Sequence, residues 1–113
     1  MCIRDSQYDV RLTAGAEQDL RGLHAFRMTQ AGREAADALL ADIASTAGAL
    51  ATFPDRESIP LELQALGMTE YRQTLCKPYR ILYRVVDTTV FVVLICDGRR
   101  DMQSLLERRL LTR

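Results

Sequence analysis

Arginines are the residues of this chain whose type and spacing could do chemistry. Arg80 and Arg84 are four positions apart in a stretch of strand-like alternation, so both are expected on one face of a strand. Arg99 and Arg100 follow the next apolar run, directly after Gly98. A guanidinium group binds phosphate or carboxylate oxygens through paired hydrogen bonds. Together the four side chains could therefore form a patch that faces a phosphate.

A structural role for these arginines stays open beside the functional one. Their side chains could pair with acidic neighbours such as Asp87 and Asp97, or simply cover the sheet. For Arg99 and Arg100 a functional role is favoured, because loops that follow strand ends often carry binding and catalytic residues.

Groups that could move protons are harder to find near these arginines. His24 is the only histidine, and it lies in a predicted helix far from the C-terminal arginines, so we interpret it as a surface or packing residue. Tyr79 and Tyr83 share a strand face with apolar residues, which favours aromatic packing over acid–base work. Ser104 has no histidine near it, and Cys96 lies in an apolar run where a core position is expected.

Charge divides the chain into an acidic part and a basic part. The 15 Lys/Arg and 15 Asp/Glu residues cancel overall, but residues 1–69 carry a net charge of −4 and residues 70–113 one of +4. A basic end of this kind favours an anionic or acidic partner. We therefore predict a target-binding surface made by six arginines of the basic part, namely Arg80, Arg84, Arg99, Arg100, Arg108 and Arg109.

Composition and short motifs exclude several classes of protein. The chain has no glycine-rich phosphate loop, metal-ligand spacing or cofactor motif, so we predict no cofactor and no metal. Cys2, Cys76 and Cys96 are odd in number, which favours reduced thiols in a cytoplasmic protein. The longest apolar run is about a third of the roughly twenty residues that a membrane helix needs. We expect residues 1–7 to be a disordered or non-native extension and residues 8–113 to be one domain.

The elements that must position the arginines centre on a predicted hairpin. Residues 79–86 alternate in strand fashion, and residues 90–96 are entirely apolar, which predicts a strand covered on both faces. Asp87, Thr88 and Thr89 join the two strands. We expect Val92 and Leu94 to point to one side of the sheet and Val93 and Ile95 to the other, because successive side chains of a strand alternate between its faces.

Periodicity places the remaining elements around this hairpin. The predicted elements are a strand over residues 8–12, a helix capped by Thr13 that fades near residue 29, a turn at Gly32, a helix over residues 36–50, at most one helical turn within 61–66, a strand over 71–77 and a helix over 101–111. The predicted order is thus β-α-α-β-β-β-α. We expect an α+β domain with a helical hairpin on one face of a single antiparallel sheet.

These segments resemble the toxins of the RelE/ParE superfamily, which belong to type II toxin–antitoxin systems. The resemblance spans residues 8–111 and rests on YDVRLTAGAEQDL, the helical pair, FPDR, and the final stretch, in which KPYRILYRV and DGRRDMQSLL are most specific. It implies a RelE/ParE-like fold and a labile antitoxin whose C-terminal segment wraps the sheet and the helical hairpin. It also implies one of two targets, DNA gyrase for ParE-like members or mRNA on the ribosome for RelE-like members.

The residues at the C-terminal end bear on the choice between these targets. RelE-like nucleases usually offer a tyrosine or histidine close to the C-terminus, and residues 97–113 contain neither. We therefore favour a ParE-like plasmid stabilisation protein that inhibits growth by binding gyrase, without chemistry of its own. The alternatives are a ribosome-dependent mRNA endonuclease in which Arg80, Arg99 and Arg100 are the catalytic candidates, and an inactive relative that only binds antitoxin.

Overall fold

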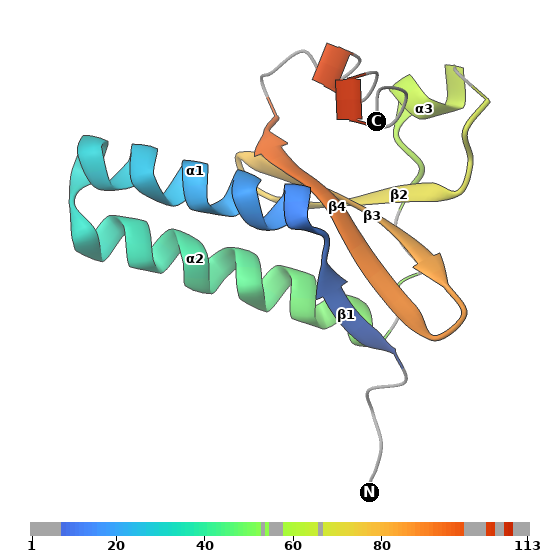
Figure 1. Ribbon diagram of the computed structural model, residues 1–113, viewed down its shortest axis with the longest axis horizontal. Coiled ribbons are helices and arrows are strands. Elements are labelled where there is room, and N and C mark those ends of the chain that lie inside the picture. Colours follow the sequence, from blue (N-terminus) through green and yellow to red (C-terminus); the bar gives the residue numbers. More distant parts are fainter. Residues whose placement is uncertain are drawn as a thin grey trace, which may run out of the picture.

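A four-stranded mixed sheet forms the centre of the fold in the computed structural model (Figure 1). The structure describes residues 8–52, 54, 58–65, 67–98, 104–105 and 108–109. The strands are β1 (Asp9–Leu12), β2 (Tyr71–Cys76), β3 (Tyr79–Val86) and β4 (Thr89–Asp97), in the order β1-β4-β3-β2. No helix of the described residues is long and apolar enough to cross a membrane.

Strand direction is the part of the predicted sheet that was wrong. β2, β3 and β4 pair antiparallel, as expected of strands joined by tight turns, but β1 pairs parallel to β4. A short turn forces antiparallel pairing, whereas a long connection allows either direction. The helices α1 (Ala14–Ala31) and α2 (Arg33–Gly48) follow β1, so alternation alone could not fix its direction. The predicted β-α-α-β-β-β order of elements is confirmed.

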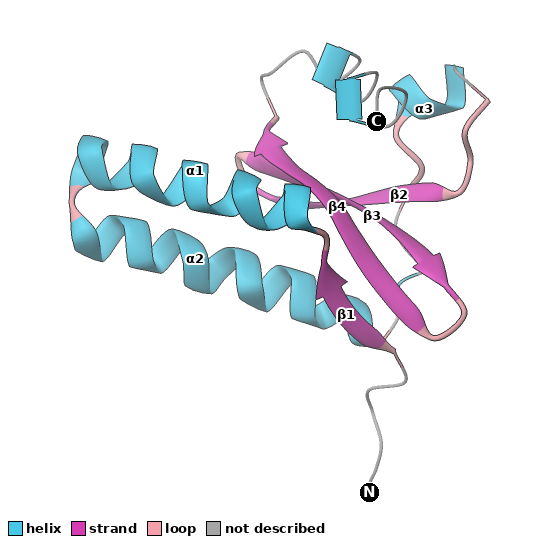
Figure 2. Cartoon of the chain, viewed as in Figure 1, coloured by secondary structure: helices cyan, strands magenta, loops and turns pink. Residues whose placement is uncertain are grey.

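The two long helices form a hairpin that packs on one face of the sheet (Figure 2). Thr13 caps α1 as predicted, because its hydroxyl oxygen accepts a hydrogen bond of 3.2 Å from the Ala16 amide. Gly32 makes the turn between the helices with φ of 96°, a backbone conformation that favours glycine. The hairpin extends well beyond the end of the sheet (Figure 1).

Short helical elements follow this hairpin. They are the 3-10 helix η1 (Ala49–Ala51) and the one-turn helix α3 (Leu61–Ala65), which confirms the short turn predicted there. Of the predicted C-terminal helix, residues 104–105 and 108–109 are helical and the rest lies outside the described residues. The predicted extension over residues 1–7 also lies outside them.

Each face of the sheet has its own apolar cluster. The hairpin-side cluster lies between the sheet and the two long helices, and its buried members are Ala16, Leu39, Ile43, Ala47, Leu50, Ile81, Tyr83, Val90, Val92 and Ile95. The cluster on the opposite face comprises Leu63, Tyr71, Leu82, Leu94 and Cys96, with Leu105 packed against it. The strand-like alternation of β3 therefore gave the correct faces, since Ile81 and Tyr83 lie under the helices and Leu82 does not.

A β-bulge changes the facing of β4. Tyr83 pairs with Val92 and Leu82 pairs with Leu94, so Val93 is an extra residue in the second strand. As a result Val92 faces the helices and Leu94 faces the opposite side. The predicted grouping of these two residues on one side is wrong, because one inserted residue inverts the alternation beyond it.

Candidate functional site

Arg80 lies on the sheet face opposite the helical hairpin, next to the end of β4. Its Nε atom donates a 2.8 Å hydrogen bond to Oε1 of Gln73 on the neighbouring strand. The Gly98 amide donates a 2.7 Å bond to the Pro78 carbonyl, which holds the end of β4 against the β2–β3 turn. A Cβ atom on Gly98 would lie 3.0 Å from that carbonyl oxygen and 3.4 Å from Cγ of Arg80.

This close approach explains why a glycine precedes the arginine pair. A larger residue at position 98 would crowd the Pro78 carbonyl, which accepts the hydrogen bond from the residue 98 amide. The structure therefore brings Arg80 next to the point where the chain leads into Arg99 and Arg100. Those two residues lie outside the described residues.

Arg84 lies on the same face as Arg80, near the opposite end of β3. Its guanidinium lies over the ring of Tyr71, with 5.6 Å between the guanidinium carbon and the ring centroid. Its Nε atom is buried and has no hydrogen-bond partner among the described residues. Arg80 and Arg84 are four positions apart on the strand, so their Cα atoms are separated by about 13 Å, and Leu82 lies between them. The prediction of one shared face is confirmed.

Whereas Arg108 is exposed, the Arg109 side chain makes hydrogen bonds to other parts of the fold. Its Nη2 atom lies 2.9 Å from Oδ1 of Asp19 in α1, and its Nη1 atom lies 3.1 Å from Oδ2 of the same carboxylate. The Nη1 atom also donates a 2.7 Å bond to the Val93 carbonyl at the bulge. Asp19 Oδ2 in turn accepts a 3.0 Å bond from the Ile95 amide. Of the two arginines predicted here to bind a target, Arg108 is the one at the surface.

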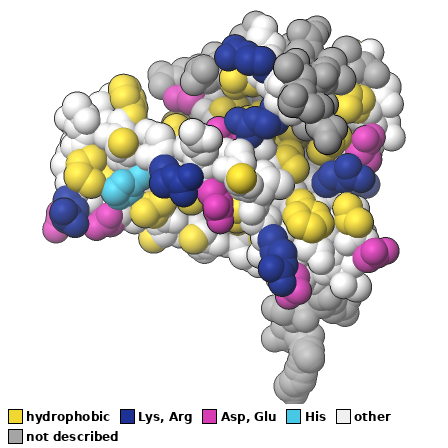
Figure 3. All heavy atoms as spheres, in the orientation of Figure 1, with side chains coloured by type: hydrophobic (Ala, Val, Ile, Leu, Met, Phe, Trp, Pro, Cys, Tyr) yellow, Lys and Arg dark blue, Asp and Glu magenta, His cyan; other side chains and the backbone are white. Residues whose placement is uncertain are grey.

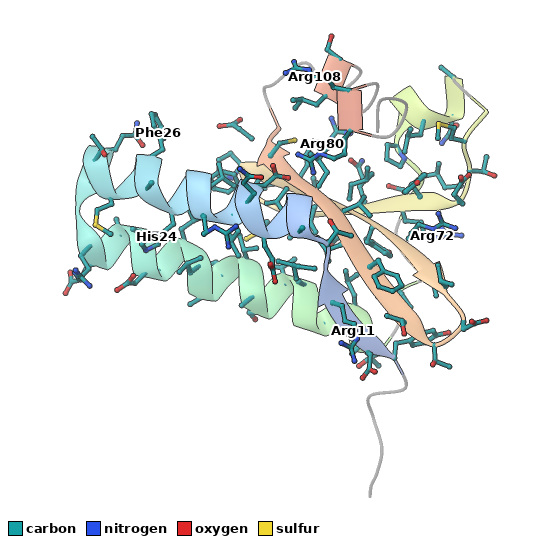
Figure 4. All side chains as sticks on the ribbon, in the orientation of Figure 1. Arg11, His24, Phe26, Arg72, Arg80 and Arg108 are labelled. Atoms are coloured by element: carbon teal, nitrogen blue, oxygen red, sulfur yellow. The ribbon has the colours of Figure 1, made fainter. Side chains whose placement is uncertain are left out.

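Among the described residues, the histidine and the tyrosines lie away from the sheet face that carries Arg80 and Arg84, with one exception. His24 lies on the helical hairpin, where its Nε2 atom is 3.0 Å from Oδ1 of Asp37 (Figure 4). Tyr79 and Tyr83 lie on the hairpin side of the sheet, as predicted. The exception is Tyr71, which shares the face of the arginines and was missed because only the β2–β3 pairing register places it there.

A groove of about 1100 Å³ lies between the helical hairpin and the end of the sheet. Its apolar lining includes Leu23, Phe26 and Leu39 from the helices, and Pro78, Ile95 and Leu105 from the other side. Phe26 is 63% exposed, an unusual position for a large apolar side chain. Figure 3 shows hydrophobic side chains at the surface of the helical hairpin, interspersed with charged ones. The lining also includes the charged residues Asp19, Lys77 and Arg109, so the groove suits an amphipathic segment of a partner protein.

The thiols and acidic side chains of the described residues give no sign of a metal centre. No group of three or more His, Cys, Asp or Glu among them could hold a metal ion. Cys76 packs against the cluster under the helices, whereas Cys96 is buried in the cluster on the other face. The two free cysteines are thus separated by the sheet.

Comparison with known proteins identifies a matching family and 12 similar chains of solved structures, two of which are described below. The profile of the family described as "ParE toxin of type II toxin-antitoxin system, parDE" matches residues 10–102. A chain of the chromosomal ParDE system from P. aeruginosa is similar with a TM-score of 0.70 and 16% identity, over 80% of this chain and 96% of that one. A chain of the RelBE2 toxin–antitoxin complex from Mycobacterium tuberculosis is similar with a TM-score of 0.58 and 25% identity, over 83% and 94%. No curated protein sequence matches the chain.

Proposed function

Since the chain belongs to the family of ParE toxins of type II toxin–antitoxin systems, we propose that it inhibits growth by binding DNA gyrase in the cytoplasm. A cognate antitoxin would neutralise it. The target-binding surface would be the arginine face, with Arg80 and Arg84 on β3 and the basic residues that follow β4. The proposal concerns binding, since the arginines need no chemistry of their own to block an enzyme.

The observation that supports the choice of gyrase is the position of the histidine and of most tyrosines among the described residues. His24 lies on the hairpin, and Tyr79 and Tyr83 lie on the side of the sheet that the helices cover. Cleavage of RNA through its 2′-hydroxyl needs a base and an acid within hydrogen-bond reach of the reacting atoms. Among the described residues, Tyr71 is the tyrosine on the arginine face and it is nearly buried, so the arginines there are better suited to steering and complementary binding.

The groove provides a place for the antitoxin. Its lining combines apolar residues from both sides with charged ones such as Asp19 and Lys77, and Phe26 is an exposed apolar side chain in that lining. An amphipathic segment laid into the groove would cover that surface. The structural relatives come from ParDE and RelBE2 toxin–antitoxin systems, which supports a partner of this kind for the present chain.

One observation favours a ribosome-dependent mRNA endonuclease as the second candidate. Tyr71 lies on the arginine face, with its ring under the Arg84 guanidinium, and a tyrosine can donate or accept a proton. The similarity to a RelBE2 chain is compatible with this alternative. Against it, the Tyr71 residue is only 7% exposed, which leaves little access for a substrate.

Two assays run in parallel on the purified protein would test the proposal. We expect inhibition of gyrase-catalysed DNA supercoiling at protein concentrations that leave translation in a cell-free system unchanged. Primer extension on mRNA from cells expressing the protein would detect ribosome-dependent cleavage. Codon-spaced cuts without gyrase inhibition would reverse the assignment, and a lack of both effects would leave the inactive, antitoxin-binding relative.

A further inference from the structure

The Asp19–Arg109 ion pair joins three parts of the chain that are distant in sequence. Asp19 projects from the second turn of α1, and Arg109 comes from the C-terminal residues. Both side chains also bond to β4, since the Val93 carbonyl accepts from Arg109 and the Ile95 amide donates to Asp19. Both backbone groups lie at or just past the bulge and beyond the last pair of β1 with β4, which is Leu12 with Val92.

The geometry of this pair is more specific than that of an ordinary surface ion pair. Two guanidinium nitrogens lie 2.9 and 3.1 Å from the two carboxylate oxygens, a fork-to-fork arrangement. The side chains of Arg109 and Asp19 are only 31% and 18% exposed. Partial burial and the two backbone bonds limit the solvent screening that weakens exposed pairs.

Gly15 leaves the space that Arg109 occupies. A Cβ atom built on Gly15 would lie 2.9 Å from Nη1 and 3.2 Å from the guanidinium carbon of Arg109. An arginine tip can normally move away at little cost. Here a move would stretch the hydrogen bonds to Asp19 and Val93, so the added methyl group would compete directly with the ion pair.

The ion pair also fixes the edge of the groove. Asp19, Leu105 and Arg109 all contribute to its lining, while Arg108 next to them is exposed. The position of Arg109 therefore affects the shape of that side of the groove and the position of the neighbouring Arg108.

We propose that Asp19 and Arg109 form a latch that holds the basic C-terminal residues on the end of the sheet, so that Arg109 is a positioning residue and Arg108 the one presented to a partner. Gly15 is part of the latch because it leaves room for the guanidinium. The effect on growth inhibition rests on the function proposed above. The existence of the latch does not depend on that function.

The rate of trypsin cleavage after Arg109 reports on the latch, because the Arg109 side chain must leave Asp19 before it can enter the specificity pocket of the protease. Gly15→Ala should raise the rate of cleavage at this bond by on the order of tenfold, the scale of losing one paired, charge-assisted contact. Gly48→Ala is the matched control, since it is also a helical glycine and its added Cβ would meet nothing within 4 Å. Asp19→Asn should act like Gly15→Ala, because it removes the charge but keeps an oxygen for the Ile95 amide.

Thermal unfolding of the same variants separates the latch from a general loss of stability. Gly→Ala inside a helix favours the folded state, so Gly15→Ala should melt no lower than the unmodified chain. Faster cleavage at Arg109 alone, with an unchanged melting temperature, is the expected result. Equal cleavage rates in all variants, or faster cleavage at every arginine together with a lower melting temperature, would overturn the latch.

Growth inhibition tests what the latch does for function. Expression of Gly15→Ala should inhibit growth severalfold less than expression of Gly48→Ala at equal protein levels, since Arg108 would no longer be held in place. Equal inhibition by both variants would overturn the presenting role. If the unmodified chain fails to inhibit gyrase, the proposed function falls while the cleavage result still decides the latch.

Discussion

The two faces of the sheet are covered by different amounts of structure. On one face α1 and α2 lie over the strands and bury a large apolar cluster that includes Ile81 and Ile95. On the other face, among the described residues, the five-residue helix α3 and Leu105 accompany a smaller cluster. Arg80 and Arg84 both lie on this second face. Among the described residues, the face under the long helices holds the larger apolar cluster, and the other face carries the two arginines.

The difference shows how a small domain can keep charges over an apolar layer. Arg80 is held by Gln73, and Arg84 lies over Tyr71, so each guanidinium has a fixed neighbour on the sheet. Leu82, which lies between them on the strand, is 1% exposed and packs in the apolar cluster beneath the two arginines. Fixed charges of this kind lose less conformational entropy on binding than free arginines at a loop would.

Truncation of two neighbouring core residues should give the largest effects and measure the contrast directly. Ile95 and Leu94 are 3% and 2% exposed but lie in different clusters. We expect Ile95→Ala to cost about 3–5 kcal/mol, because two long helices hold the cavity open, and Leu94→Ala to cost about 2–3 kcal/mol, because the shorter cover can collapse. Urea unfolding of both variants would provide the two values.

A reversed order would contradict this view of the two faces. If Leu94→Ala cost more than Ile95→Ala, the face with the arginines would be the more rigid one. Leu75→Ala is a suitable control, since this residue is 52% exposed on β2 and its truncation should change the unfolding free energy by less than about 0.5 kcal/mol.

Substitution of the arginines after β4 should give the next largest effect, on activity and not on stability. The double variant with Arg99→Ala and Arg100→Ala should lose growth inhibition by at least about tenfold and still bind antitoxin. Arg99→Lys and Arg100→Lys should each retain most of the activity, because a docking surface depends mainly on charge. Growth curves at matched expression and co-purification with antitoxin are the measurements.

Strong loss in the lysine variants would move the assignment toward a nuclease. A phosphate held by a planar, bidentate guanidinium is not held equally by an ammonium group. In that case each lysine variant should fall by about an order of magnitude or more, the scale of one preorganised contact.

Regular periodicity made most of the fold predictable from the sequence. The helical spacing, Thr13 as a cap, Gly32 as a turn and the alternation of β3 each follow from local rules, and each is confirmed. Placement of Arg80 and Arg84 on one face followed from the same alternation. Local patterns of this kind survive folding because the tertiary contacts agree with them.

The features that escaped prediction depend on contacts between distant residues. The bulge at Val93 is not visible in an unbroken apolar run, so the facing of Val92 and Leu94 was wrong. The pairing of Arg109 with Asp19 joins positions 90 residues apart, and the sequence distinguishes neither from other charges. Tyr71 lies at the candidate site because it pairs with Arg84 across the two strands, and no sequence motif in β2 predicts this pairing.

Removal of one buried hydroxyl should produce a moderate effect on the hairpin side. Tyr83 is fully buried, and its hydroxyl donates a hydrogen bond to the Pro54 carbonyl. Tyr83→Phe would leave that carbonyl without its partner, and we expect a loss of about 1–3 kcal/mol in unfolding free energy. Gyrase inhibition measured well below the melting temperature should be unchanged. Lower inhibition by a fully folded variant would show that this face also takes part in binding.

The same substitution on the arginine face should produce the smallest effect and is the sharpest test of function. Tyr71→Phe keeps the ring beneath the Arg84 guanidinium and so preserves the cation–π contact. A gyrase-binding toxin should therefore retain its growth inhibition within about twofold, since binding by charge does not use the hydroxyl. A nuclease that used Tyr71 as acid or base should lose about a hundredfold or more of its cleavage rate, the range typical of a missing proton-transfer group. Growth curves alongside primer extension would separate the two outcomes, with Tyr79→Phe from the covered face as the control.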